Sequence, residues 1–191
     1  WIAASAMVGG AATGRMIARV VEPAKAMVLG KDVGPVISDA ARKRIIGYID
    51  AAEKAGAKVL VDGRGASVKG QDGGYFIGPT IIDHVTPEMA IAQEEVFGPV
   101  LVIIRAKDVD EALRIENASP YGNAASVFTE SGGVARHVME HASAGMVGVN
   151  VPLPVPVAYH SFGGWKRSMF GDHAVYGPEG VRFYTRLKTI S

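Results

Sequence analysis

The residues best suited to chemistry lie in one short segment, residues 93–99, which reads Gln-Glu-Glu-Val-Phe-Gly-Pro. Two adjacent carboxylates, Glu94 and Glu95, precede the aromatic ring of Phe97 and a Gly-Pro break that leads into an apolar run. Carboxylates accept hydrogen bonds, and an aromatic ring can pack against a flat ligand. The plain alternative is a solvated acidic turn with Phe97 in the core, and composition alone favours that alternative by about two to one.

A second candidate is the segment His137-Val138-Met139-Glu140-His141, which matches the H-x-x-E-H pattern. At this spacing two imidazoles share one helical face, an arrangement that some zinc proteases use. A third protein ligand is unassigned, so we interpret the segment as an ordinary surface helix and expect no metal site.

Composition narrows the class of partner. The sequence has no cysteine, which excludes disulfides, thiolate chemistry and Cys-ligated zinc within the chain. Lys plus Arg number 20 against 19 Asp plus Glu, so we expect no nucleic acid and no membrane partner, but a small molecule or another subunit. The weakly charged stretches 1–14 and 144–159 are too short or too polar to span a bilayer. The sequence begins at Trp1, without Met and without the basic head of a signal peptide, and we interpret this start as a cut end. We expect a cytoplasmic protein.

The elements that must position these residues follow from hydrophobic spacing. It predicts helices over residues 11–27, from a Ser38 or Asp39 cap to about Gly56, from Asp108 onward and over residues 133–142. Apolar and β-branched runs predict strands over residues 58–61, 75–82, 100–104, 124–128 and 146–149. Alternating strands and helices indicate an α/β fold with a mostly parallel sheet.

The tail differs in kind from the rest. Residues 181–190 alternate two kinds of side chain: Arg182, Thr185 and Lys188, which would face outward, and Phe183, Tyr184 and Leu187. We predict a terminal strand that joins a sheet elsewhere in the molecule or in a neighbouring subunit. An unchanged oligomer mass after its deletion would contradict the intersubunit version.

Several segments together resemble the aldehyde dehydrogenase superfamily. They are EEVFGPV at 94–100, GYFIGPTIID at 74–83, SPYGNAASVFT at 119–129, GMVGVN at 145–150, SFGGWKRS at 161–168 and FYTRLKTIS at 183–191. Within the superfamily, the proline-containing run at residues 149–172 resembles the CoA-acylating methylmalonate-semialdehyde dehydrogenases. The chain is shorter than the family near residues 10 and 30.

The resemblance implies a fold and a reaction. Residues 1–180 would form the C-terminal part of that family's three-layer catalytic domain. Residues 181–191 would form an oligomerisation strand. The dinucleotide-binding half, with its glycine loop, would lie upstream. A thiol would attack a semialdehyde, NAD would take the hydride, and CoA would accept the acyl group. The nucleophile is expected at or just before Trp1, so this chain alone should be inactive.

The resemblance also assigns roles to residues. Glu95 would accept hydrogen bonds from the nicotinamide ribose, because a carboxylate can bind two vicinal hydroxyls, and Phe97 would pack beside it. Glu94 is expected to be structural. Phe162, His160 and Asn150 are candidates for the substrate pocket.

Each pocket candidate has a plain alternative. For Phe162 it is an ordinary core position, for His160 a hydrogen-bonded loop histidine, and for Asn150 an amide that satisfies loop backbone. Lys166 and Arg167 could meet a carboxylate or a CoA phosphate, but solvated loop cations are the favoured interpretation.

Two other functions stay open. One is a hydrolytic NAD(P)-dependent aldehyde dehydrogenase, which the proline-containing run disfavours. The other is a truncated, non-catalytic paralogue that acts only in assembly. For the leading interpretation we expect a homo-oligomer, dimer or tetramer, built through the C-terminal strand.

Overall fold

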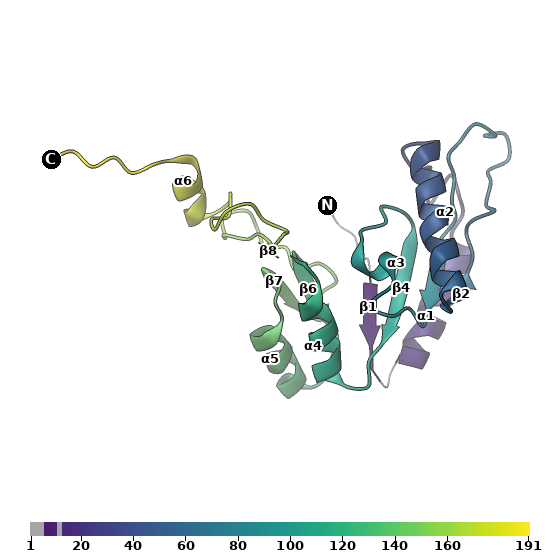
Figure 1. Ribbon diagram of the computed structural model, residues 1–191, viewed down its shortest axis with the longest axis horizontal. Coiled ribbons are helices and arrows are strands. Elements are labelled where there is room, and N and C mark those ends of the chain that lie inside the picture. The colour runs from purple at the N-terminus through teal and green to yellow at the C-terminus, as the bar shows by residue number, and fades with distance from the viewer. Residues whose placement is uncertain (1–5, 11–12) are drawn as a thin grey trace. The chain divides into compact units, whose positions relative to one another are not determined.

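A computed structural model describes residues 6–10 and 13–191 and divides the chain into two compact units, Trp1–Asp108 and Val109–Ser191 (Figure 1). One domain over residues 1–180 was expected from the sequence. The boundary at Asp108 arises because each unit closes its own apolar cluster, one around Ile103 and one around Leu113. Each unit therefore has a core of its own.

The first unit is built on a four-stranded sheet with the order β1-β4-β3-β2. The strands are β1 (Ala6–Gly9), β4 (Val100–Arg105), β3 (Thr80–Asp83) and β2 (Lys58–Val61). β1 and β3 run parallel to β4, whereas β2 is antiparallel to β3. The sheet is consequently mixed, and the expectation of parallel pairing holds for β1, β4 and β3 but not for β2.

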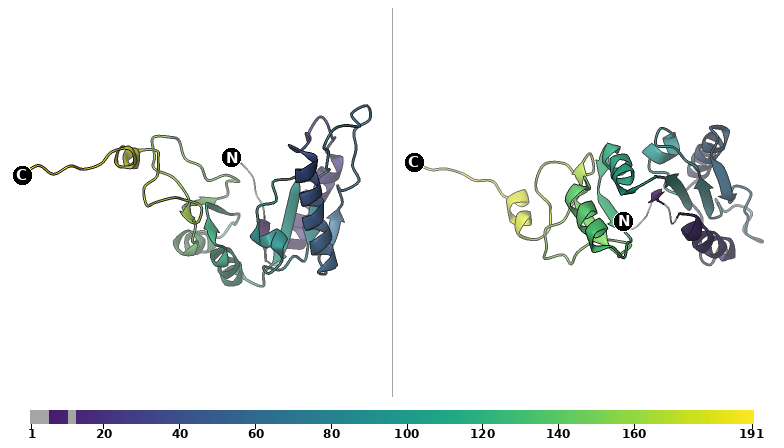
Figure 2. Two further views of the ribbon diagram at one scale, coloured as in Figure 1. Left: turned by 45° about the horizontal axis from the view of Figure 1, so that its top comes forward. Right: turned by 90° about the horizontal axis from the view of Figure 1, so that it is seen from below.

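Three helices belong to this unit, α1 (Thr13–Ala26), α2 (Asp39–Lys54) and the short α3 (Ala90–Gln93). Figure 2 shows α1 and α2 on opposite faces of the sheet. The α1 face packs on Ile81 and Ile103, and α2 contributes the fully buried Ile45 and Ile49. Helices on both faces of a sheet give the unit three layers.

The second unit is a smaller α/β arrangement. Parallel strands β6 (Ala124–Val127) and β7 (Met146–Val149) pack against α4 (Val109–Ala118) and α5 (Gly132–His141). The core here is Leu113, Val138 and Ala142. A separate antiparallel pair joins β5 (Tyr121–Gly122) to β8 (Trp165–Lys166), and α6 (Pro178–Tyr184) follows.

Most helices and strands predicted from the sequence are confirmed. The Ser38 cap is present, since its hydroxyl accepts a hydrogen bond from the Ala41 amide at 3.1 Å. Residues 11 and 12, where the first predicted helix was to begin, lie outside the described residues. The predicted strand over residues 75–82 is wrong in its first half, because Pro79 cannot donate to a ladder and pairing starts at Thr80.

The predicted strand over residues 181–190 is also wrong for its first part. Residues 181–184 belong to α6, which Pro178 begins in the first helical turn, a position that proline favours. Residues 185–191 pair with no strand of the described chain. Within residues 6–10 and 13–191, no helix has the length and apolar character needed to cross a membrane.

Candidate functional site

The acidic segment, residues 93–99, links the end of α3 to the start of β4 in the first unit. The Glu94 amide still bonds to the Ala90 carbonyl at 2.9 Å, and the chain then turns outward. Glu95 is exposed, Val96 is buried and Phe97 is 56% exposed. The interpretation of Phe97 as a core residue is therefore wrong, and the segment presents a carboxylate and an aromatic ring to solvent.

Phe97 has an unusual backbone conformation. Its φ is +54°, in the left-handed region that residues other than glycine rarely adopt. Such a conformation persists when neighbouring groups enforce it, and it is concentrated at functional sites. The backbone at Phe97 is consequently held by its surroundings.

The supporting groups come from α2. The Arg44 guanidinium donates from Nη2 to the Val96 carbonyl at 3.0 Å, and the Tyr48 hydroxyl forms a hydrogen bond with the Glu94 carboxylate. That hydrogen bond and burial raise the pKa of Tyr48 above its ordinary value, so Tyr48 stays protonated and donates at neutral pH. Glu94 thus has the structural role expected for it.

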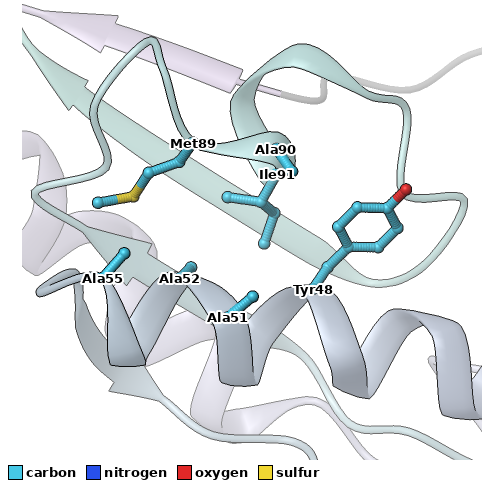
Figure 3. Close-up of a pocket in the computed structure, with 7 residues that line it drawn as sticks. All are labelled: Tyr48, Ala51, Ala52, Ala55, Met89, Ala90 and Ile91. Atoms are coloured by element: carbon cyan, nitrogen blue, oxygen red, sulfur yellow. The ribbon is translucent and has the colours of Figure 1, made fainter.

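A small apolar pocket lies between α2 and α3 (Figure 3). Its lining consists of Tyr48, Ala51, Ala52, Ala55, Met89, Ala90 and Ile91. Tyr48 stands at one end of it, and the lining carries no charged side chain. The pocket lacks the convergent polar groups that fix the orientation of a ligand.

Asn150 has a backbone role in the second unit. Its Oδ1 accepts from the Thr129 amide at 2.9 Å and its Nδ2 donates to the Thr129 carbonyl at 3.0 Å. Both ends of the amide are therefore occupied by one loop residue. This geometry favours the structural alternative over a place in the substrate pocket.

His160 and Phe162 lie within the proline-containing run, residues 149–172. Phe162 is half-buried and stacks on Tyr176, with ring centroids 4.9 Å apart and planes at 6°. His160 is exposed, with its ring centroid 4.5 Å from that of Tyr159. The two residues are neighbours on one loop, so the structure leaves both available as pocket candidates within this unit.

Lys166 and Arg167 both have partners in the protein. Lys166 Nζ donates to the carbonyls of Asn117 and Ser119, at 3.0 and 3.1 Å, and Arg167 lies 5.6 Å from the ring centroid of Tyr121. These contacts join Lys166 of β8 to the end of α4, and Arg167 to β5. A structural role is the simpler interpretation of both cations.

The two histidines of the H-x-x-E-H segment also have partners. His137 Nε2 lies 2.7 Å from Asp110 Oδ1, and His141 Nδ1 lies 2.8 Å from the His137 carbonyl. The described part of the chain contains no group of three His, Asp or Glu side chains arranged to hold a metal ion. The geometry agrees with a surface helix that packs on α4.

The structure thus groups the predicted site residues by unit. Glu95 and Phe97 share one loop of the first unit, whereas Asn150, His160 and Phe162 belong to the second. The expected place of the nucleophile, at or before Trp1, lies outside the described residues. Sequence reasoning missed Arg44 and Tyr48, although their spacing of four on a helix places them on one face.

Comparison with known proteins gives a consistent result. The family model described as the aldehyde dehydrogenase family matches residues 3–190. The malonate-semialdehyde dehydrogenase of Pseudomonas aeruginosa is 48% identical over 196 residues, covering 100% of this chain and 39% of the relative. A second relative, from Drosophila melanogaster, has a name that includes methylmalonate-semialdehyde/malonate-semialdehyde dehydrogenase and the qualifier acylating. It is 52% identical over 164 residues, and the match covers 86% of this chain and 32% of the relative.

A solved structure agrees with these relatives. The Mycobacterium tuberculosis aldehyde dehydrogenase, crystallised with NAD+, superimposes with a TM-score of 0.85 at 32% identity. The match covers 97% of this chain and 38% of that one. The chain therefore spans less than half the length of the proteins that it resembles.

Proposed function

Because this chain belongs to the aldehyde dehydrogenase family, we propose that it is part of an NAD-dependent enzyme that oxidises a malonate-type semialdehyde to an acyl-CoA. The names of the relatives from Pseudomonas aeruginosa and Drosophila melanogaster support this substrate class, and the word acylating in the second name supports CoA as acceptor. We further propose that the chain corresponds to the C-terminal part of the catalytic domain and is inactive alone.

The observation that carries the proposal is the pair of exposed side chains on the acidic segment. The Glu95 carboxylate has no hydrogen-bond or ion-pair partner among residues 6–10 and 13–191, so its oxygens are available to accept from ligand hydroxyls. Phe97 exposes more than half of its surface two residues away. A carboxylate and an aromatic face at this spacing fit the ribose and the adjoining ring of a nicotinamide nucleotide.

In this mechanism the chain positions the cofactor. NAD, when bound, accepts the hydride that leaves the aldehyde carbon. Glu95 fixes the ribose and Phe97 limits the orientation of the ring, which aligns the reactants before reaction. The attacking thiol belongs to a part of the protein outside these 191 residues, since none of them is cysteine.

Replacing Glu95 by glutamine tests the cofactor contact. In the complete gene product, Glu95→Gln should weaken NAD binding about tenfold, because a hydrogen bond to a charged acceptor is replaced by one to a neutral amide. Titration with NADH, followed by its fluorescence, measures this affinity without requiring turnover. Glu140→Gln, the same change at an exposed glutamate on α5, is the matched control and should leave the affinity unchanged. Equal affinities of Glu95→Gln and wild-type protein would contradict the assignment.

The choice of acyl acceptor is tested by assaying the complete gene product with malonate semialdehyde, with and without CoA. We expect NADH to accumulate in proportion to CoA and the acyl-CoA ester to be the product. Rapid NADH formation with free acid in the absence of CoA would instead identify the hydrolytic alternative. Absence of NADH formation under both conditions would favour the non-catalytic paralogue.

Two further assignments belong to this proposal. Phe162 and His160 are proposed to line the acyl or CoA pocket, with support from their place on one loop and from the exposure of His160. Asn150 has weaker support, because Thr129 occupies its amide. A role of residues 185–191 in homo-oligomer assembly is supported by the exposed Leu187 and Ile190.

A further inference from the structure

We propose that Arg44 and Tyr48 of α2 are positioning residues, which hold the acidic segment so that Glu95 and Phe97 present their side chains to the cofactor. This inference rests on the proposed function of that segment. It concerns two residues that no sequence motif of the chain singled out, and all of its contacts lie within the first unit.

The two ends of the segment are held by backbone hydrogen bonds. At one end the Glu94 amide bonds to the Ala90 carbonyl at 2.9 Å, and at the other the Thr80 amide bonds to the Pro99 carbonyl at 2.8 Å. Between these anchors, the Arg44 guanidinium reaches the Val96 carbonyl at 3.0 Å. Arg44 therefore supplies a fixed point in the middle of the segment.

The position of this contact matters for Phe97. The Val96 carbonyl belongs to the peptide plane that precedes Phe97, and φ, which is +54° at Phe97, is the rotation about the N–Cα bond that follows this plane. A donor at the Val96 carbonyl fixes the plane, and so opposes relaxation of Phe97 toward the ordinary negative φ. Loss of Arg44 would release the ring without removing any atom that touches the cofactor.

Contacts with α2 alternate along the segment. Glu94 bonds to Tyr48, the Val96 carbonyl bonds to Arg44, and Gly98 packs against Ile45, where an added Cβ would lie 2.7 Å from Ile45 Cδ1. The residues between these three are Glu95 and Phe97, and both are exposed. The three contacts hold the backbone on both sides of Glu95 and of Phe97, and so restrict the directions in which these two exposed residues can point.

Arg44 and Tyr48 also support each other. They are four residues apart on α2, and the guanidinium lies 5.9 Å from the centroid of the Tyr48 ring, within the range of a cation–π contact. Figure 3 shows Tyr48 on the side of α2 that faces Ala90 and Ile91 of α3. The helix therefore offers the segment a paired donor set in a fixed geometry.

The experiment uses Arg44→Ala, Arg44→Lys and the control Arg42→Ala in the complete gene product. Arg42 lies on the same turn of α2 and pairs only with Asp39, at 3.3 Å, in the described contacts. Arg44→Ala should weaken NADH binding about fivefold and raise the KM for NAD, with the KM for aldehyde unchanged. Arg44→Lys should recover most of the affinity, because one ammonium donor can still reach one carbonyl, and Arg42→Ala should match wild type.

Two comparisons separate a positioning role from a general loss of stability. Arg44→Ala in a Glu95→Gln background should add little to the loss of affinity, because the positioned group is already impaired. If Glu95→Gln weakens binding but Arg44→Ala does not, the inference is overturned and the cofactor contact stands. If Glu95→Gln has no effect, the cofactor contact itself fails. A uniform loss of affinity for NAD and aldehyde in Arg44→Ala would also overturn the inference, since it would indicate general destabilisation.

Discussion

Replacing Gly63 by alanine is expected to lower the free energy of unfolding by about 3 kcal/mol or more. An added Cβ would lie 1.9 Å from the Gly78 carbonyl oxygen and 2.6 Å from its Cα. Both glycines are buried, and the Gly78 amide also donates to the Gly63 carbonyl at 2.8 Å. Backbone on both sides leaves no flexible side chain that could move, so the two segments must separate.

Urea unfolding followed by circular dichroism measures this effect, and Gly65→Ala is the matched control. Gly65 is exposed, and an added Cβ there would meet no heavy atom within 4 Å. Its replacement should be neutral or slightly stabilising, because alanine has fewer unfolded conformations than glycine. Equal stability of the Gly63→Ala and Gly65→Ala variants would show that the backbone approach is not a constraint.

The same pair of glycines illustrates what sequence can and cannot predict. The Asp62-Gly63 pair is a common turn signal in sequence, and the structure has the chain leaving β2 at that point. The reason that residue 63 is glycine is different, since it depends on residue 78 across a loop. Local patterns indicate turns, whereas close approaches between distant segments arise only when the chain is folded.

Elements defined by local spacing were the most predictable. Helix α2 was expected with a cap at Ser38 or Asp39, and the structure has Ser38 as the cap; capping and a repeat of three and four are properties of neighbouring residues. The tail shows the limit of this reasoning. Its alternation favoured a strand, but the Gly177-Pro178 start of α6 determined the local structure, and an edge strand requires a partner to form.

The candidate site divides in the same way. Glu95 and Phe97 were predicted from the segment that contains them. Their exposure shows that the plain interpretation, with Phe97 in the core, is wrong, and their role toward the cofactor stays a prediction. Arg44 could not be found, because its partner Val96 lies 52 residues away in sequence and the contact is to a backbone carbonyl, which any residue provides.

Replacing Asp83 by asparagine is expected to lower the free energy of unfolding by about 2 to 3 kcal/mol at neutral pH. The Asp83 side chain is only 4% exposed at the end of β3, and Arg105 at the end of β4 binds both of its oxygens, at 3.1 and 2.7 Å. The His84 amide adds a third hydrogen bond at 2.7 Å. Asparagine keeps the size of the side chain but removes the charge and one acceptor.

The pH dependence of this difference tests its electrostatic origin. Burial alone would raise the pKa of Asp83, but the bonds from Arg105 and the His84 amide outweigh it and hold the pKa below the ordinary value of 3.8. A carboxyl with a depressed folded pKa contributes its full stability above the unfolded pKa and loses it as the pH falls through the folded pKa. The gap between wild type and Asp83→Asn should therefore be constant from neutrality down to about pH 5 and close below about pH 4. Urea titrations at several pH values measure it, with the exposed Asp72→Asn as control. A gap that persists undiminished in acid would mean that Asp83 acts through its shape and neutral hydrogen bonds, not through its charge.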